Sequence, residues 1–161
     1  MVVLRCTQKL RQRVPAPVGG AEPTATTILG EWTCHLVHFG RIQAILCVSH
    51  VTLLPVLLPA PQAKTFPVRL ATALSEVLVG LATPAQIAQE VAEMTEFSIA
   101  PTNNRQVLGS LNDFKRMADW SVVSAEPDHL LAVSRQLAEA PCKPIDYQSP
   151  ERATAAAFAV R

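Results

Sequence analysis

The pattern of apolar and polar positions divides the chain into a strand-rich first part and a helix-rich second part. Short apolar runs rich in β-branched residues are typical of strands, and they occur at 2–6 (VVLRC), between Leu29 and Ser49, at 51–58 (VTLLPVLL) and at 97–102 (FSIAPT). The order of strands followed by helices indicates an α+β domain. We expect a single domain built on an antiparallel, hairpin-based sheet that packs against about four helices.

A hairpin is predicted within the second of these runs. Gly40-Arg41 separates two β-rich segments, and a glycine at the first central position fits a two-residue type II′ turn. This turn pairs Phe39 with Ile42 and Cys34 with Cys47, the latter as a non-hydrogen-bonded pair. The proline at position 55 places the next strand at an edge or a bulge of the sheet.

After Lys64 the apolar residues recur every three to four positions, which predicts helices. The expected helices cover about 65–79, a segment that begins after a Thr83 cap with Gln86 three residues later, about 103–119, and Asp128–Ala140. The last residues, 149–161, contain many alanines, so we expect a loosely held C-terminal tail after a domain that spans 1–148.

The helix predicted at 103–119 has two different faces. At about 100° per residue, its core-facing stripe consists of Val107, Leu111, Phe114 and Ala118. The opposite face consists of Arg105, Gly109, Asn112 and Arg116, with Asp113 beside them. Asn103 is expected to cap the helix while Gln106 reaches back to it. Gly109 costs about 1 kcal/mol relative to alanine inside a helix, so it marks either a close contact or an ordinary solvated face that packs under another segment.

Composition and charge narrow the possible partners and the location. The chain has 14 Lys plus Arg against 13 Asp plus Glu, so no net field attracts nucleic acid. Hydrophobic residues make up 49% of the sequence, which favours a self-association surface. The start lacks the charge order and long apolar region of a secretory signal, and the uncharged run at 42–63 is broken by three prolines, so we expect a cytoplasmic protein without a membrane segment.

Cysteines and histidines cluster between Cys34 and His50 and are the first candidates for a metal site. On a strand, successive side chains point to opposite faces, so His35 faces away from Cys34, and we expect neither a metal site nor a cofactor. The four cysteines lack CxxC spacing and are expected to be reduced and buried. No local signature of a nucleophilic, nucleotide-binding or metalloprotease site is present in the sequence.

Three stretches together resemble a family of small bacterial domains of unknown function. They are CTQKL at 6–10, LGEW at 29–32 and TNNRQVLGSLNDF at 102–114. The family resembled begins with a CTQKL-like strand and carries a T-x-N-R-S-V-L-G-S-M-N-D motif, from which this chain departs at Gln106. The resemblance spans roughly 2–148 and implies a stand-alone bacterial α+β protein without a known activity. It carries over to five motif residues: Asn104, Arg105, Gly109, Asn112 and Asp113.

Two functional hypotheses follow from the helix at 103–119. In the first, the domain is a non-catalytic interaction module whose polar face, which includes Arg116, holds a protein partner or a second copy of the chain. In the second, it is a small enzyme or a protein that binds an anionic ligand, in which Arg105 holds the anion and Asp113 acts as a base. A concave pocket that contains both residues would favour the second hypothesis.

Overall fold

The structure, a computed structural model, describes residues 1–14 and 21–161. Residues 15–20, which belong to a loop predicted from its Pro and Gly content, lie outside the described residues. Five strands are present: β1 (Val2–Cys6), β2 (Trp32–Phe39), β3 (Ile42–Ser49), β4 (Pro55–Pro59) and β5 (Phe97–Pro101). The helices are α1 (Gln8–Arg11), α2 (Phe66–Val77), α3 (Pro84–Glu93), α4 (Arg105–Ala118), α5 (Pro127–Leu137) and α6 (Pro150–Ala159), with 3-10 turns at Ala63–Thr65 and Lys143–Ile145.

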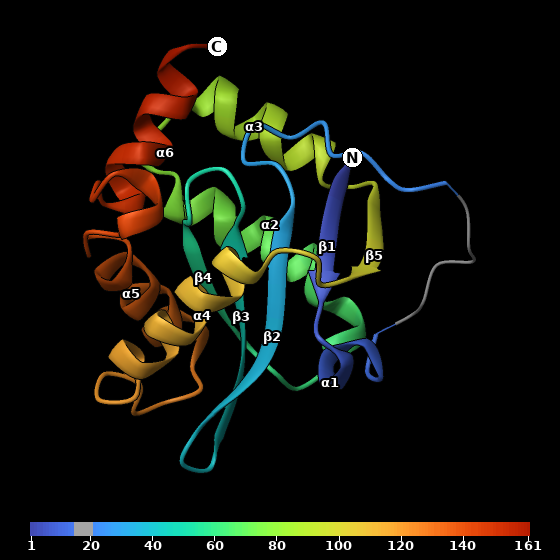
Figure 1. The fold of residues 1–161 in the computed structure, drawn as a ribbon, viewed down its shortest axis with the longest axis vertical. Helices are drawn as coiled ribbons and strands as arrows, with labels where there is room; N and C mark the ends of the chain where they lie inside the picture. The colour runs from blue at the N-terminus through green and yellow to red at the C-terminus, as the bar shows by residue number, and fades with distance from the viewer. Residues whose placement is uncertain (15–20) are drawn as a thin grey trace.

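The strands form one mixed sheet in the order β4-β3-β2-β1-β5 (Figure 1). The domain is therefore a single α+β unit, as predicted, but the expectation of a purely antiparallel sheet is wrong. Strand β1 is parallel to both β2 and β5. Parallel neighbours need long connections, and these are present because residues 7–31 separate β1 from β2 and several helices precede β5.

The predicted hairpin register is confirmed. Phe39 pairs with Ile42 and Cys34 with Cys47 across β2 and β3. Gly40 has a φ of 62°, a conformation that glycine adopts without the steric penalty of a Cβ atom. The two-residue turn therefore fixes which face of the sheet each side chain occupies.

Strand β4 lies at the edge of the sheet, as the proline predicted, and its outer edge is blocked. Pro55 and Pro59 have no N–H to offer another strand. The N–H of Leu57, which shares their outward orientation, donates to the Ser134 Oγ atom of α5 over 2.8 Å. This edge therefore cannot add a strand from another chain in the usual way. The strand starts at Pro55 rather than at 51 because the turn after β3 holds Leu53 at a φ of 58°.

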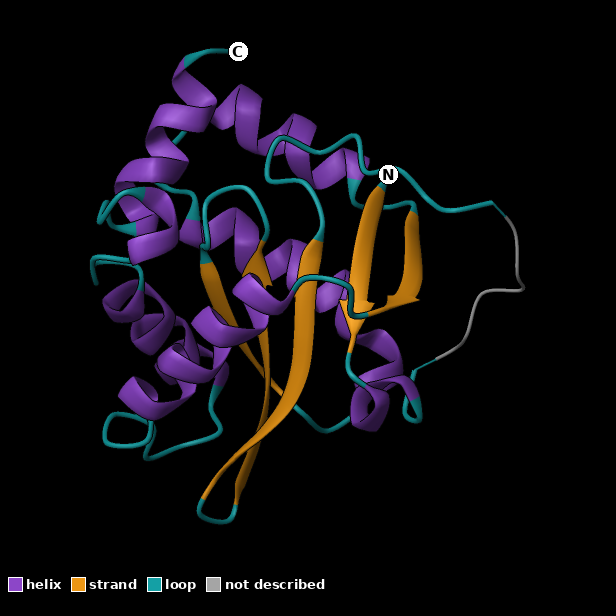
Figure 2. Ribbon diagram, in the orientation of Figure 1, coloured by secondary structure: helices purple, strands orange, loops and turns teal. Residues whose placement is uncertain are grey.

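Helices cover both faces of the sheet (Figure 2). Helices α4 and α5 pack on one face, where Leu111, Phe114 and Leu137 meet β-strand residues such as Leu46 and Val48. Helices α2 and α6 contribute to the core on the opposite face, which contains Phe66, Leu70, Leu74, Phe158, Leu4, Ile45 and the thiols of Cys6, Cys34 and Cys47. Burial of these two apolar layers is the main stabilising contribution to the fold.

The predicted helices are present with small shifts at their ends. Thr83 and Gln86 form the expected capping box at the start of α3. The cap of α4 is Asn104 rather than Asn103. Helix α5 starts at Pro127 and ends at Leu137, three residues before the expected end at Ala140.

The C-terminal segment differs from the loose tail expected at 149–161. It forms α6, in which Phe158 is only 1% exposed and packs in the core. Thr154 donates a hydrogen bond from its Oγ1 atom to the Thr52 Oγ1 atom over 2.9 Å. The alanine-rich segment is held against the core by this one large apolar side chain, because burial of a phenylalanine contributes about 3 kcal/mol.

No helix in the described parts of the chain is both long enough and apolar enough to cross a membrane.

Candidate functional site

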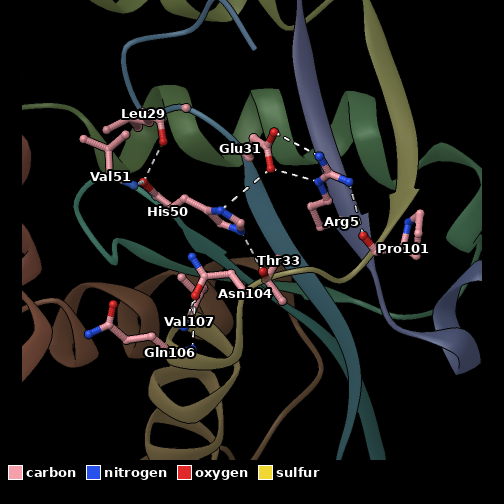
Figure 3. A network of polar contacts seen from close by, with 12 residues as sticks. Arg5, Leu29, Glu31, Thr33, His50, Val51, Pro101, Asn104, Gln106 and Val107 are labelled. Carbon is pink, nitrogen blue, oxygen red and sulfur yellow. Dashed lines mark hydrogen bonds and ion pairs between the residues drawn. The ribbon is translucent and has the colours of Figure 1, made fainter. Parts of the chain in front are cut away.

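Residues at or next to the three motif stretches lie close together in the structure: Arg5 precedes the first stretch, Glu31 belongs to the second, and Pro101 precedes the third (Figure 3). Strand β1 pairs with β2 through Leu4 and Trp32 and with β5 through Cys6 and Pro101. The end of β1, the residue before β2 and the loop between β5 and α4 therefore meet at one place. Polar side chains gather there, and we call Arg5, Glu31, Thr33 and His50 the Arg5 network.

Arg5 is the centre of this network, although it is only 3% exposed. Its Nε and Nη2 atoms donate to the two carboxylate oxygens of Glu31 over 2.8 and 3.1 Å. Nη2 also lies 2.5 Å from a carboxylate oxygen of Glu22, and Nη1 lies 3.5 Å from the carbonyl oxygen of Pro101. The hydrogen bonds that Arg5 donates to Glu31 are the main reason that the pKa of Arg5 is raised. The hydrogen bonds to these carboxylates offset the desolvation cost of burying the guanidinium.

His50 extends the network to β2. Its Nε2 atom lies 2.8 Å from the Thr33 Oγ1 atom, and its Nδ1 atom lies 3.8 Å from a carboxylate oxygen of Glu31. Burial lowers the pKa of His50, and the charge of Arg5 lowers it further, against the opposite effect of Glu31. The imidazole is therefore favoured in its neutral form at pH values near 7.

A hydroxyl, an imidazole and a carboxylate in this order resemble the groups of a nucleophilic site. Thr33, however, is 0% exposed, so no substrate reaches its hydroxyl in this structure. A second histidine, His35, makes a similar contact, with its Nδ1 atom 2.7 Å from the Thr7 Oγ1 atom. We therefore interpret the Arg5 network as an internal polar support that ties β1, β2 and β3 together.

The residues predicted as a site lie on and around the outer face of α4. Asn104 has a structural role because its Oδ1 atom accepts hydrogen bonds from the N–H groups of Gln106 and Val107, both over 3.1 Å. Exposed positions along the helix hold the others: Arg105, Gly109, Asn112, Asp113 and Arg116. Arg116 donates to the Asp113 carboxylate over 2.8 Å.

Arg105 and Asp113 are not brought to one site. Eight residues separate them, which corresponds to about 12 Å along a helix at its usual rise. Asp113 lines a groove on the surface, and Arg105 does not. Among the described residues, the groove that Asp113 lines does not include Arg105, so it does not support the enzyme hypothesis.

The groove runs along α4 and has a volume of about 470 Å³. One wall is the helix, and the other is the segment at 140–147; the lining includes Gly109, Asp113, Phe114, Met117, Cys142 and Tyr147. We call this cavity the α4 groove. Close to it on the chain, after the end of α4, the indole of Trp120 is 92% exposed. Sequence reasoning missed the second wall because 140–147 shows no helical or strand periodicity.

Gly109 forms part of the α4 groove without an internal reason for being glycine. A Cβ atom at this position would meet no neighbouring atom within 4 Å among the described residues. The ordinary reading, in which Gly109 packs under another segment of the chain, therefore does not hold for the part of the chain that the structure describes. The missing side chain leaves space that is open to the outside.

The clustered cysteines and histidines between Cys34 and His50 are not brought together as a metal site in the described residues. Cys6, Cys34 and Cys47 lie on adjacent strands on the α2 side of the sheet, whereas His35 faces the α4 side. Within 1–14 and 21–161, no group of three His, Cys, Asp or Glu side chains is placed to hold a metal ion. Burial, together with hydrogen bonds to Cys47 and Cys6, raises the pKa of Cys34 well above its ordinary value, so this thiol is protonated and inert.

Comparison with known proteins gives a family. Residues 3–153 match the family described as Domain of unknown function (DUF6933). The chain belongs to this family. The match confirms the predicted membership of a family of unknown function, and it covers the Arg5 network, the α4 groove and the first turn of α6. Neither a curated protein nor a solved structure matches this DUF6933 chain. Its bacterial origin and the motif pattern stay predictions.

Proposed function

We propose that this DUF6933 domain is a non-catalytic interaction module that binds a protein partner in the α4 groove. The observation that carries the proposal is the open space at Gly109, because a helical glycine without an internal contact costs stability and makes room for something outside the chain. The volume of the groove, about 470 Å³, is within the range of binding pockets.

The side chains around the groove are those that dominate protein interfaces. Met117 and Tyr147 line it and are exposed, and Trp120 follows one turn after Arg116. Met, Tyr, Trp and Arg are enriched in protein interfaces, and a few such residues supply most of the binding free energy.

Charge defines the chemistry of the partner. Arg116 is paired with Asp113, whereas Arg105 on α4 and Lys143 on the groove wall have no ion-pair partner among the described residues. Lys143 therefore places an unpaired positive charge in the groove wall, and Arg105 places one at the start of the same helix α4. We infer a partner that inserts an apolar side chain into the groove and presents a carboxylate to Lys143.

Site-specific photo-crosslinking tests this proposal. A photoreactive amino acid at Met117 or Tyr147 should capture the same protein in cells, because both positions line one groove. The exposed Val68 on α2 is the matched control, because α2 packs on the opposite face of the sheet. Capture of the same proteins from all three positions would contradict the proposal, as would capture of a second copy of the chain alone.

A further inference from the structure

A second cavity, independent of the α4 groove, lies between α2 and the first turn of α5, over the edge strand β4. Its volume is about 490 Å³, which is within the range of small-molecule sites. Its walls are mainly apolar and include Leu58, Pro59, Ala73, Pro127 and Leu131. We call it the α2–α5 cavity.

The charges around this cavity are unequal. Three carboxylates line it: Glu76 on α2, and Glu126 and Asp128 at the start of α5. None of the three forms an ion pair within 4 Å in the described parts of the chain; Arg135 donates to the backbone carbonyl of Glu76 over 3.0 Å but not to its carboxylate. A chain with a formal net charge of +1 thus concentrates negative charge at this apolar opening.

Arg69 is the cation that lines the cavity, and its donors are already in use. Its Nη1 atom donates to the Pro59 carbonyl over 2.7 Å, and its Nη2 atom donates to the carbonyls of Pro61 and Gln62, both over 3.1 Å. Its Nε atom lies 3.2 Å from the Thr65 Oγ1 atom. Arg69 is therefore committed to holding the loop after β4, and burial lowers its pKa.

The positive end of α5 is likewise neutralised from within the chain. Asp128 occupies the first turn of that helix, where its carboxylate interacts favourably with the helix dipole. Glu76 lies two turns along α2 from Arg69, about 10 Å away at the usual helical rise. Arg69 forms no ion pair with any of the three carboxylates among the described residues, so their charges are not neutralised by this cation.

We propose that the α2–α5 cavity binds an organic cation: a protonated amine whose apolar body lies on Leu58, Ala73 and Leu131 and whose ammonium group faces Glu126 and Asp128. The apolar lining supplies most of the binding free energy, and the carboxylates select the charge of the ligand. This inference does not depend on the protein partner proposed above.

Three probes of one shape test the charge preference: phenethylamine, phenethyl alcohol and hydrocinnamate. Amide NMR titrations of the full chain should show shifts at Ala73, Asp128 and Leu131 with the amine. The amine should bind about fivefold more tightly than the alcohol, because exposed ion pairs contribute modestly. The carboxylate should bind most weakly.

Paired variants identify the groups responsible. Glu126→Gln with Asp128→Asn should reduce the affinity for the amine to that of the alcohol and leave the affinity for the alcohol unchanged. Asp119→Asn with Glu139→Gln removes the same charge from exposed residues outside the cavity and should change nothing. Absence of shifts at the cavity, tighter binding of hydrocinnamate than of the amine, or an unchanged preference in the cavity variant would overturn the proposal.

Discussion

The four cysteine thiols of this chain differ in solvent exposure and therefore in reactivity. Cys6, Cys34 and Cys47 are buried in one row, whereas Cys142 is partly exposed in the α4 groove. Burial, and to a smaller extent Asp113, raises the pKa of Cys142, so this thiol reacts slowly but remains accessible.

We therefore expect brief alkylation of the native protein to modify Cys142 and to leave the other three thiols unmodified. After unfolding, all four should react. Under forced oxidation, the Cys34–Cys47 pair should give a link because the two residues are directly opposite across the hairpin. Peptide mapping by mass spectrometry measures both outcomes, and rapid native labelling of Cys34 would show that the sheet opens readily.

His50 makes stability depend on pH. Its pKa is lowered in the folded state, so below its ordinary value of 6.5 the unfolded chain binds the proton first. The contribution is complete above that value and is lost as the pH falls through it toward the folded-state pKa. His35, whose pKa burial also lowers, acts in the same direction.

We predict that the free energy of unfolding falls between about pH 7.5 and about pH 5.5, and that His50→Gln makes this fall smaller. Denaturant titrations at each pH measure the slope. The exposed His38→Gln is the control and should keep the slope of the wild type. An equal slope in the wild type and in His50→Gln would show that the Arg5 network does not depend on a neutral imidazole.

Helix α6 is the element whose contribution differs most from what composition indicates. Phe158→Ala should lower the free energy of unfolding by about 3–5 kcal/mol, because a fully buried phenylalanine leaves a cavity when truncated. Val160→Ala, two residues later on an exposed position, should change it by less than about 0.5 kcal/mol. Similar small effects of both substitutions would mean that α6 is not docked on the core in solution.

The elements show which features a sequence can predict. The hairpin register followed from Gly40-Arg41, and the two faces of α4 followed from its apolar period, because turns and helical stripes are local patterns. The docking of the C-terminal segment on the core was not predicted because one residue, Phe158, decides it through contacts with distant elements. The exact start of α4 depends on the capping contacts of one side chain, Asn104, which the helical pattern does not specify.

At the scale of the whole molecule, the sheet brings together residues that the sequence keeps apart. Arg5 and Glu31 pair because β1 is parallel to β2, a topology that no local pattern specifies. The α4 groove combines a predicted helix face with the segment at 140–147, which has no periodicity of its own. The helix could therefore be predicted as a candidate surface, but the cavity beside it could not.

A substitution at Gly109 should alter binding without impairing folding, because no other described segment of the chain occupies the space beside this residue. Gly109→Ala should raise the free energy of unfolding by up to about 1 kcal/mol, because alanine is the better helix former and its methyl group meets no neighbour. Gly80→Ala is the contrasting variant, since Gly80 has a φ of 86° and should lose stability on substitution. Thermal or denaturant unfolding measures both, and a loss of stability in Gly109→Ala would mean that the helix needs glycine for its own packing.

The most direct test of the proposed function uses the partner protein that is captured by photo-crosslinking at Met117. Its affinity is measured for the wild-type domain and for the Gly109→Leu variant. The leucine side chain should fill the α4 groove while the domain stays folded, because nothing lies within 4 Å of the new Cβ atom. Calorimetry should show at least a tenfold loss of affinity, about 1.4 kcal/mol, whereas Ala85→Leu on the exposed surface of α3 should bind as the wild type does. Undiminished binding by a folded Gly109→Leu would contradict the account, because the partner would then not occupy the groove.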